Sequence, residues 1–291
     1  MDFKRDVKVL TENEDDLRER LWVSDGTTEA VGKIDDYEYE PLARKPKPDW
    51  RKPTTDELKL LSTSDKREDA AKTIGLVSLP MDIRADIVSL GIPEVKSYAE
   101  IMQIRKRSPL EYLETMDKIY AFKNQFLKKE EGYHKIDVNV KMRQRETLTI
   151  DLKKHYLTGL HFDAWEFQTM DKAQSATNRI CLNLGKKDRY FVFLNLTLKS
   201  VYEAVQSDIN IDISKEYDKD PLAQQFLTSH PEYPVVKVKV KPFEGYIAPT
   251  ENIIHDGSSM DMYSSDDEED IRDVTLTTRG YFSLFPLNQV V

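Results

Sequence analysis

The order of the periodic segments constrains the fold of this chain most strongly, because helical patterns come first and strand patterns follow. Between Ser64 and about Glu130, apolar residues recur at intervals of three and four positions, which is typical of amphipathic helices. After Gly132 the pattern changes to that of strands, of which we count about eight. An α+β fold is therefore predicted, with an antiparallel sandwich or jelly roll behind a helical layer.

Two helices are marked clearly. The first contains Ile83, Ile87 and Leu90, and Gly91 is expected to end it. The second is predicted to begin at Ser108-Pro109, a capping residue followed by a proline in the first turn. Its apolar stripe is expected to pack on a sheet and consists of Tyr112, Leu113, Met116, Ile119, Tyr120 and Phe126.

The strands are indicated by alternation and by apolar runs between turn residues. Val236–Val240 alternates valine with lysine, which suggests that one face of this strand is solvated. Besides the strand expected to carry His161 and Asp163, the predicted strands cover residues 136–140, 147–152, 178–184, 190–198, 236–240, 245–254 and 274–284.

Composition sets the domain organisation and excludes several classes of protein. The 291 residues suffice for a sizeable core, and we expect one compact domain with an extended N-terminal arm (1–64), a helical support region (65–130) and a jelly-roll core (131–291). A net charge of −9 disfavours nucleic acid as a partner. The single cysteine, Cys181, allows no internal disulfide, and neither a signal peptide nor a membrane-spanning run is evident. We therefore expect a soluble cytoplasmic protein without a membrane partner.

The residues that carry chemistry are His161 and Asp163, separated by Phe162. In an extended strand, positions i and i+2 point to the same face, so an imidazole and a carboxylate converge. One further imidazole would complete two nitrogens and one oxygen on one side of a metal, the facial triad of non-haem Fe(II) oxygenases. An H-x-D triplet also occurs by chance in many proteins, so the assignment of a metal site depends on the third ligand.

His255 is the best candidate for that third ligand. It closes an apolar run just before Asp256-Gly257, and we expect it to end a buried strand beside a turn at the mouth of the barrel. His155 lies in a polar strand end or turn, and His230 precedes a proline in a loop. The predicted metal ligands are therefore His161, Asp163 and His255, which span 94 positions (255 − 161).

Four stretches together resemble the barrel of the Fe(II)/2-oxoglutarate-dependent dioxygenases: residues 158–163, 178–185, 189–196 and 245–255. The resemblance covers roughly residues 131–291 and implies a double-stranded β-helix that binds Fe(II), 2-oxoglutarate and O₂. It implies hydroxylation of an unactivated C–H bond in a small molecule, such as an amino acid or a specialised metabolite, with succinate and CO₂ as co-products. Family members that halogenate lack the carboxylate supplied here by Asp163, although desaturation and cyclisation stay open.

The family also implies a basic residue on the last barrel strand for the distal carboxylate of 2-oxoglutarate. Arg279 lies inside a good strand, whereas Arg272 directly follows the acidic run at 266–270, so Arg279 is the predicted anchor. It stands 24 positions beyond His255 (279 − 255), farther than is usual in the family. The acidic segment 258–270 is read as an insertion, either a surface loop or a lid over the metal.

Trp165 would share the face of the ligand pair if the strand continued, and would then line the substrate pocket or simply pack in the core. Two other functions compete with the oxygenase. One is a metal-dependent cupin-like enzyme that uses no 2-oxoglutarate, and the other is a non-catalytic barrel-fold binding protein. The sequence leaves the oligomeric state open.

Overall fold

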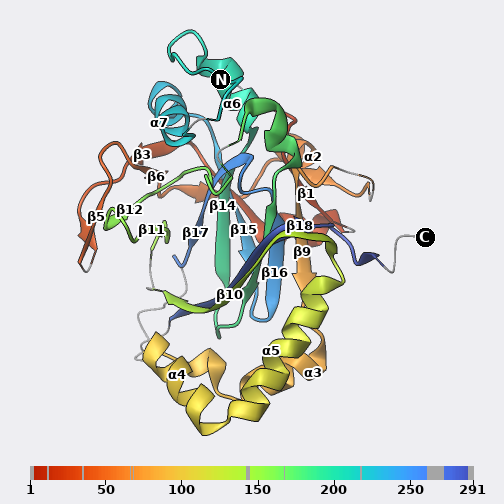
Figure 1. The fold of residues 1–291 in the computed structure, drawn as a ribbon. Coiled ribbons are helices and arrows are strands. Elements are labelled where there is room, and N and C mark those ends of the chain that lie inside the picture. The colour runs from red at the N-terminus through yellow and green to blue at the C-terminus, as the bar shows by residue number, and fades with distance from the viewer. Residues whose placement is uncertain are drawn as a thin grey trace.

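Two β-sheets packed face to face form the centre of the molecule (Figure 1). The computed structural model describes residues 3–287 except 12, 35, 66, 68, 142–144, 167, 217 and 261–271. The larger sheet has seven strands, in the order β10 (Leu127–Lys141), β18 (Asp273–Phe282), β13 (Asn178–Asn183), β16 (Glu244–Ala248), β9 (Thr73–Ser78), β1 (Lys8–Leu10) and β8 (Ser62–Thr63). The smaller has five, in the order β17 (Ile253–Ser258), β14 (Arg189–Thr197), β15 (Val235–Val240), β2 (Leu21–Ser24) and β7 (Trp50–Arg51).

The strands from β13 onward pass repeatedly between the two sheets. β13 lies in the larger sheet, β14 and β15 in the smaller, β16 in the larger, β17 in the smaller and β18 in the larger. All pairings among these strands are antiparallel. In the described part of these two sheets, parallel pairing is limited to β1 with β8 and β9. The predicted α+β class is therefore confirmed.

The predicted single strand 245–254 is wrong, because it is two strands in different sheets. A turn at 249–252 separates β16 from β17, and it is closed by backbone hydrogen bonds from Thr250 to Ala248 (3.0 Å) and from Asn252 to Pro249 (2.8 Å). Proline has no amide hydrogen for a sheet ladder, so Pro249 favours the break at this point. The turn carries the chain from one sheet to the other.

Apolar side chains from both sheets meet between them. Because neighbouring residues of a strand point to opposite faces, each strand supplies alternate residues to this interior. Cys181 and Tyr246 come from the larger sheet, and Phe191, Phe193 and Ile253 from the smaller. The candidate metal ligand His255 lies at this interior, with its ring centroid 5.5 Å from that of Phe191.

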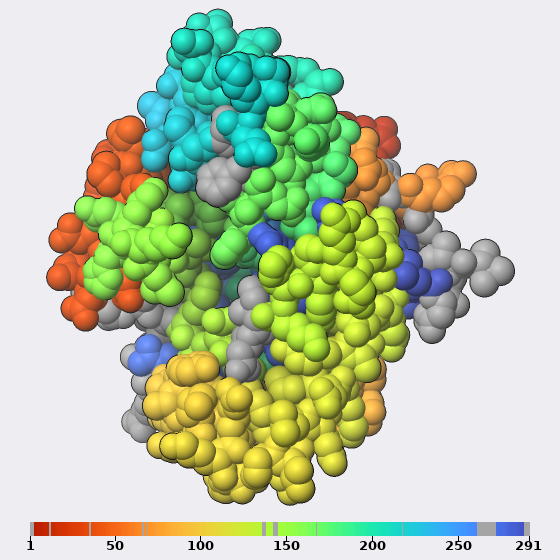
Figure 2. Space-filling model, in the orientation of Figure 1, coloured from red at the N-terminus to blue at the C-terminus, as the bar shows by residue number. Residues whose placement is uncertain are grey.

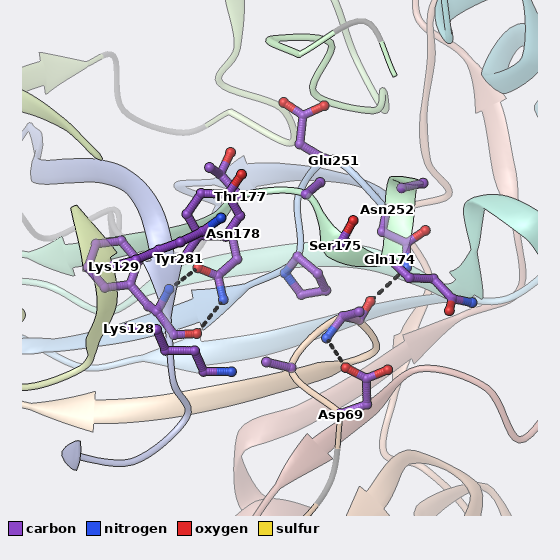
Figure 3. Close-up of a pocket in the computed structure, with 16 residues that line it drawn as sticks. Asp69, Lys128, Lys129, Gln174, Ser175, Thr177, Asn178, Glu251, Asn252 and Tyr281 are labelled. Carbon is purple, nitrogen blue, oxygen red and sulfur yellow. Dashed lines mark hydrogen bonds between the residues drawn. The ribbon is translucent and has the colours of Figure 1, made fainter. Parts of the chain in front are cut away.

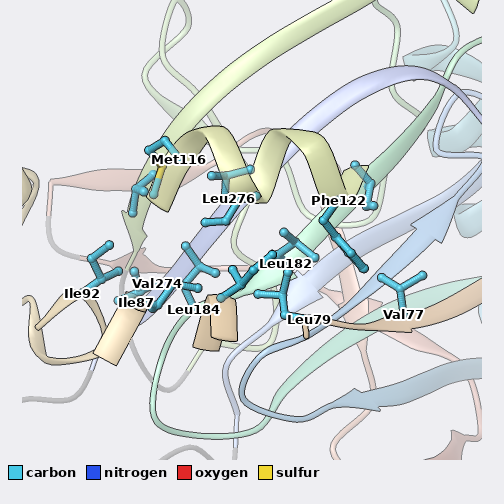
Figure 4. Close-up of a cluster of buried hydrophobic side chains, with 14 of the residues drawn as sticks. Val77, Leu79, Ile87, Ile92, Met116, Phe122, Leu182, Leu184, Val274 and Leu276 are labelled. Carbon is cyan, nitrogen blue, oxygen red and sulfur yellow. The ribbon is translucent and has the colours of Figure 1, made fainter. Parts of the chain in front are cut away.

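Three helices cover the outer face of the larger sheet: α3 (Met81–Ser89), α4 (Tyr98–Arg107) and α5 (Pro109–Asn124). Figure 4 shows Met116 and Phe122 of α5 above Leu182 and Leu276 of the sheet. Burial of such side chains contributes about 1.5–3 kcal/mol each.

The predicted end of α3 and the predicted start of α5 are confirmed, whereas α4 was not predicted, and two details of α5 differ from the prediction. Gly91 follows α3 with a φ of +74°, a conformation that glycine adopts without strain. Ser108 precedes α5, but its side chain makes no capping hydrogen bond. Leu113, expected in the apolar stripe of α5, is 56% exposed because it lies on the solvent side of the helix.

Helices also cover the outer face of the smaller sheet, which the sequence pattern did not suggest. Helices α6 (Leu198–Val205) and α7 (Asp220–Ser229) bury Val201 and Phe226 against residues of β14 such as Leu194. Short 3₁₀ helices span Ile92–Glu94 and Met170–Ser175. No helix among the residues described here has both the length and the apolar character needed to cross a bilayer.

The first 64 residues contribute strands to both large sheets and also contain α1 (Glu14–Arg20) and α2 (Thr55–Leu61). Two small sheets complete this region. One pairs β3 (Thr27–Glu29) with β6 (Arg44–Pro46), and the other joins β11 (Ile150–Asp151), β12 (Tyr156–Leu157), β5 (Tyr37–Tyr39) and β4 (Lys33–Ile34). Figure 2 shows this N-terminal region, in red and orange, against the green segment near residue 155. Of the strand predicted for 147–152, only Ile150–Asp151 (β11) forms a strand in the structure.

The solvated face predicted for Val236–Val240 is wrong, because Lys237 is only 3% exposed. Its Nζ lies 4.5 Å from the ring centroid of Tyr190 and 4.7 Å from that of Trp50. An ammonium group over aromatic faces is stabilised by the ring quadrupoles, and the aliphatic stem packs as an apolar group. Alternation of valine with lysine therefore does not identify a wet face here.

Candidate metal centre

His161, Asp163 and His255 meet inside the molecule, as predicted. One ligand atom from each residue lies within 4.8 Å of the others, and the three residues are 7%, 6% and 2% exposed. His161 and His255 form an isolated antiparallel bridge, in which each amide donates to the carbonyl of the other, at 3.1 and 2.8 Å. This backbone pair brings together two imidazoles that are far apart in the sequence.

The local structure around the ligands differs from the prediction in two respects. His161 is a single bridge residue rather than part of a strand, and the segment after it is irregular. His255 is the third residue of β17, which continues through Ser258, so it does not end a strand beside a turn. The pairing with His161 and β14 extends β17 through Asp256-Gly257.

Both imidazoles are oriented by backbone carbonyl groups. Nδ1 of His161 lies 2.8 Å from the carbonyl oxygen of Gly159, and Nδ1 of His255 lies 3.1 Å from that of Ile253. A neutral ring that donates through Nδ1 leaves the lone pair of Nε2 for a metal. The Nε2 atoms lie 3.7 and 3.9 Å from Oδ1 of Asp163, and that of His255 is buried without a hydrogen-bond partner in the described chain.

The electrostatics of the site favour the ligand forms of His255 and Asp163. Burial lowers the pKa of His255 to about 3, which keeps the ring neutral. Burial opposes ionisation of Asp163, but the Arg179 guanidinium and the two imidazoles outweigh it and hold its pKa well below the usual range. For His161, burial opposes protonation, yet Asp163 and Asp256 raise its pKa overall. A metal would compete with a proton mainly at His161.

Arg179 is a site residue that the sequence reasoning missed. Its Nη2 lies 2.6 Å from Oδ2 of Asp163, an ion pair without the alignment of a hydrogen bond, while Oδ1 faces the imidazoles. Alternation along β13 places Arg179 on the interior face with Cys181, opposite Ile180 and Leu182. This alternation is the sequence signal that could have placed Arg179 on the interior face.

Arg279 lies next to Arg179, as its directly paired residue on β18. Its Nε and Nη1 are buried and have no hydrogen-bond partner among the described residues. Unpaired guanidinium donors of this kind are costly unless an acceptor binds there. Arg272, the other candidate, precedes β18, and most of the acidic segment 258–270 lies outside the described residues.

Trp165 is 58% exposed, so the alternative that it packs in the core is wrong. The segment after His161 belongs to no strand, and the indole lies over Arg279, whose Cζ is 5.4 Å from the ring centroid. The aromatic face therefore covers the arginine that carries the unpaired donors.

A cavity of about 290 Å³ adjoins this arrangement (Figure 3). Tyr281, two residues beyond Arg279, and Thr177, two residues before Arg179, lie on one side of it, and Asn252 and Gln174 on the other. Glu251 also contributes to the wall. The three candidate metal ligands and Trp165 do not line the cavity, so it does not contain the candidate metal site.

The structure thus defines a buried site of two imidazoles and one carboxylate. No protein-family model matches the chain, and no curated protein matches it. Among solved structures it is similar to the Kdo hydroxylase KdoO, a non-heme Fe(II) alphaketoglutarate dependent dioxygenase. The complex with alphaketoglutarate and Fe(III) is 10% identical, with a TM-score of 0.36, over 73% of this chain and 81% of that one. The apo structure is 12% identical, with a TM-score of 0.32, over 96% and 87%.

Proposed function

We propose that this protein is an Fe(II)- and 2-oxoglutarate-dependent oxygenase that hydroxylates a C–H bond of a small molecule. The observation that carries the proposal is the buried His161–Asp163–His255 set, whose His255 Nε2 has no hydrogen-bond partner in the described chain. Two neutral nitrogens and one carboxylate suit Fe(II) and leave positions open for co-substrate and O₂. The alternation of β13–β18 between two sheets supports a double-stranded β-helix as the scaffold.

The residues of the chain have separate roles in this proposal. His161, Asp163 and His255 hold the metal, and the carbonyls of Gly159 and Ile253 orient the rings. When bound, Fe(II) with 2-oxoglutarate and O₂ supplies the oxidant for C–H hydroxylation, and succinate and CO₂ are released.

Arg279 is proposed to bind the distal carboxylate of 2-oxoglutarate. A guanidinium can meet a carboxylate with two parallel hydrogen bonds, and Arg279 has two buried donors to offer. Trp165 covers it and limits the access of water. For the substrate we propose a small molecule such as an amino acid or a specialised metabolite, and the adjoining cavity of about 290 Å³ has the space for one.

Anaerobic addition of Fe(II) and then 2-oxoglutarate tests this function. We expect a visible charge-transfer band from the chelate, and His255→Ala should abolish it. Iron binding without the band would favour the cupin-like enzyme, and no metal binding would favour a non-catalytic binding protein. Screening small molecules for substrate-dependent succinate release would then identify the substrate.

A further inference from the structure

We propose that Lys219 and Glu251 are positioning residues, and that this buried ion pair holds the irregular segment 163–165 so that Asp163 is presented correctly to the metal. The inference rests on the proposed metal site and adds to it two residues far from the H-x-D motif. Lys219 immediately precedes α7, and Glu251 lies in the turn between β16 and β17.

The pair is closed off from solvent and tightly bonded. The side chains are 0% and 1% exposed, and Lys219 Nζ lies 2.6 Å from Glu251 Oε2. The same ammonium group donates to the carbonyl of Glu251 at 2.8 Å and to the carbonyl of Asp163 at 3.1 Å. All three hydrogen bonds of the ammonium group are therefore accounted for.

Glu251 holds the other end of the segment. Its Oε1 accepts the backbone amide of Trp165 at 2.9 Å, while Oε2 accepts from Lys219. The amide of Asp163 donates to the carbonyl of Thr250 at 3.0 Å, in the same turn. Three backbone groups of 163–165 are thus tied to one turn and one ammonium group.

The reason for such a pair is that this segment has no regular secondary structure to fix it. Residues 162–164 belong to no strand, although Asp163 must keep Oδ1 toward two imidazoles. A buried ion pair is a poor source of stability, because removing both charges from water offsets most of their attraction. The pair instead fixes the position of Asp163, as groups outside the ligand set do when they hydrogen-bond to metal ligands.

Glu251 also connects the metal ligand to the cavity, because it forms part of the cavity wall in Figure 3. Both of its carboxylate oxygens are already bonded to the chain. Its role is therefore to support the wall and Trp165, which covers Arg279, rather than to bind a cation from the cavity.

The test uses Co(II) as a spectroscopic probe of the metal site in the full-length chain. The double variant Lys219→Met/Glu251→Gln removes both charges together, keeps an acceptor for the Trp165 amide and leaves no unpaired buried ion. We expect its melting temperature to stay near that of the wild type. Its Co(II) affinity should fall by about 10-fold to 100-fold, with a changed visible d–d spectrum. The single variant Lys219→Arg, which keeps the charge and the donors, should retain most of the wild-type Co(II) affinity.

Arg20→Met is the matched control. Arg20 forms a partly buried ion pair with Glu244 at 2.6 Å, which joins α1 to β16 without contacting the site, so its loss should leave the Co(II) spectrum unchanged. If the double variant has a lower melting temperature than the wild type, its Co(II) affinity and spectrum are measured at a temperature at which circular dichroism shows it folded. Unchanged Co(II) affinity and spectrum in the folded double variant would overturn the positioning role only. A wild-type protein that binds no Co(II) would overturn the proposed function as well.

Discussion

At the scale of single residues, the two histidines of the site differ in their preference for a proton although both face Asp163. His255 is buried among apolar rings such as Phe191, and burial lowers its pKa to about 3. For His161, the acidic neighbours outweigh burial and raise the pKa. The two ligands should therefore contribute differently to the pH dependence of metal binding.

We expect metal affinity to rise with pH by about tenfold per unit below the pKa of His161 and to level off above it. Only one proton should be displaced per metal, since His255 is neutral above a pKa of about 3 and the pKa of Asp163 is held well below its usual range. Co(II) titrations between about pH 5.5 and 8 measure this slope. A slope that corresponds to two displaced protons per metal would show that both imidazoles are charged in the metal-free protein.

Arg279→Leu should weaken 2-oxoglutarate binding by at least about 30-fold, because loss of a charged partner from a desolvated pair costs about 2–5 kcal/mol. Metal affinity should be retained, since Arg179, not Arg279, contacts Asp163. Arg272→Leu is the control and should leave the 2-oxoglutarate affinity unchanged. The titration is followed through the charge-transfer band, and equal affinity in wild type and Arg279→Leu would eliminate this assignment.

At the scale of elements, the contact of α5 with β18 contains a buried lysine. Lys123 is 0% exposed, and its ammonium group donates to the Thr278 hydroxyl and lies 4.0 Å from the Tyr120 ring centroid. Burial, and to a smaller extent Lys135, lower its pKa to about 7. The helix is thus docked on the larger sheet through a group that loses its charge near neutral pH.

This lysine should make the free energy of unfolding depend on pH. The folded pKa of about 7 lies below the ordinary value of 10.5, so the unfolded chain binds more protons between these values. The contribution of Lys123 to stability therefore increases from about pH 7 to about pH 10.5 and is unfavourable below that window. Lys123→Met should flatten this rise, which urea denaturation at several pH values can measure. A rise of the same steepness in Lys123→Met would contradict the assignment.

At the scale of the whole molecule, the candidate metal site brings together segments that are 94 positions apart (255 − 161). Arg179, which contacts Asp163, and Arg279 lie on two paired strands of the larger sheet. A ligand that binds only the folded chain stabilises it by about 2.7 kcal/mol at a concentration 100 times its Kd.

Metal binding should accordingly raise the melting temperature of the intact protein. We expect Co(II) to raise it by several degrees and a chelator to reverse the change, as followed by circular dichroism. His255→Ala, which removes a ligand from β17, should abolish the shift while the protein stays folded. An equal shift in that variant would place the bound Co(II) at another site.

Much of the fold was predictable because its signals are local. The intervals of Ile83, Ile87 and Leu90 and the Ser108-Pro109 start marked helices that the structure contains. The i, i+2 spacing of His161 and Asp163 likewise marked a pair that converges, although the backbone there is only a single bridge. Such patterns depend on the geometry of a few neighbouring residues and need no knowledge of the rest of the chain.

The sequence by itself determined the α+β class, the end of α3, the start of α5 and the three side chains that converge inside the protein. Only the tertiary structure decided that 245–254 divides between two sheets, that Lys237 is buried, and that Arg179 and Lys219 contact Asp163. The physical reason is that these facts depend on strand register and on contacts between distant segments. Register is set by the packing of both sheets at once, and no short stretch of sequence contains it.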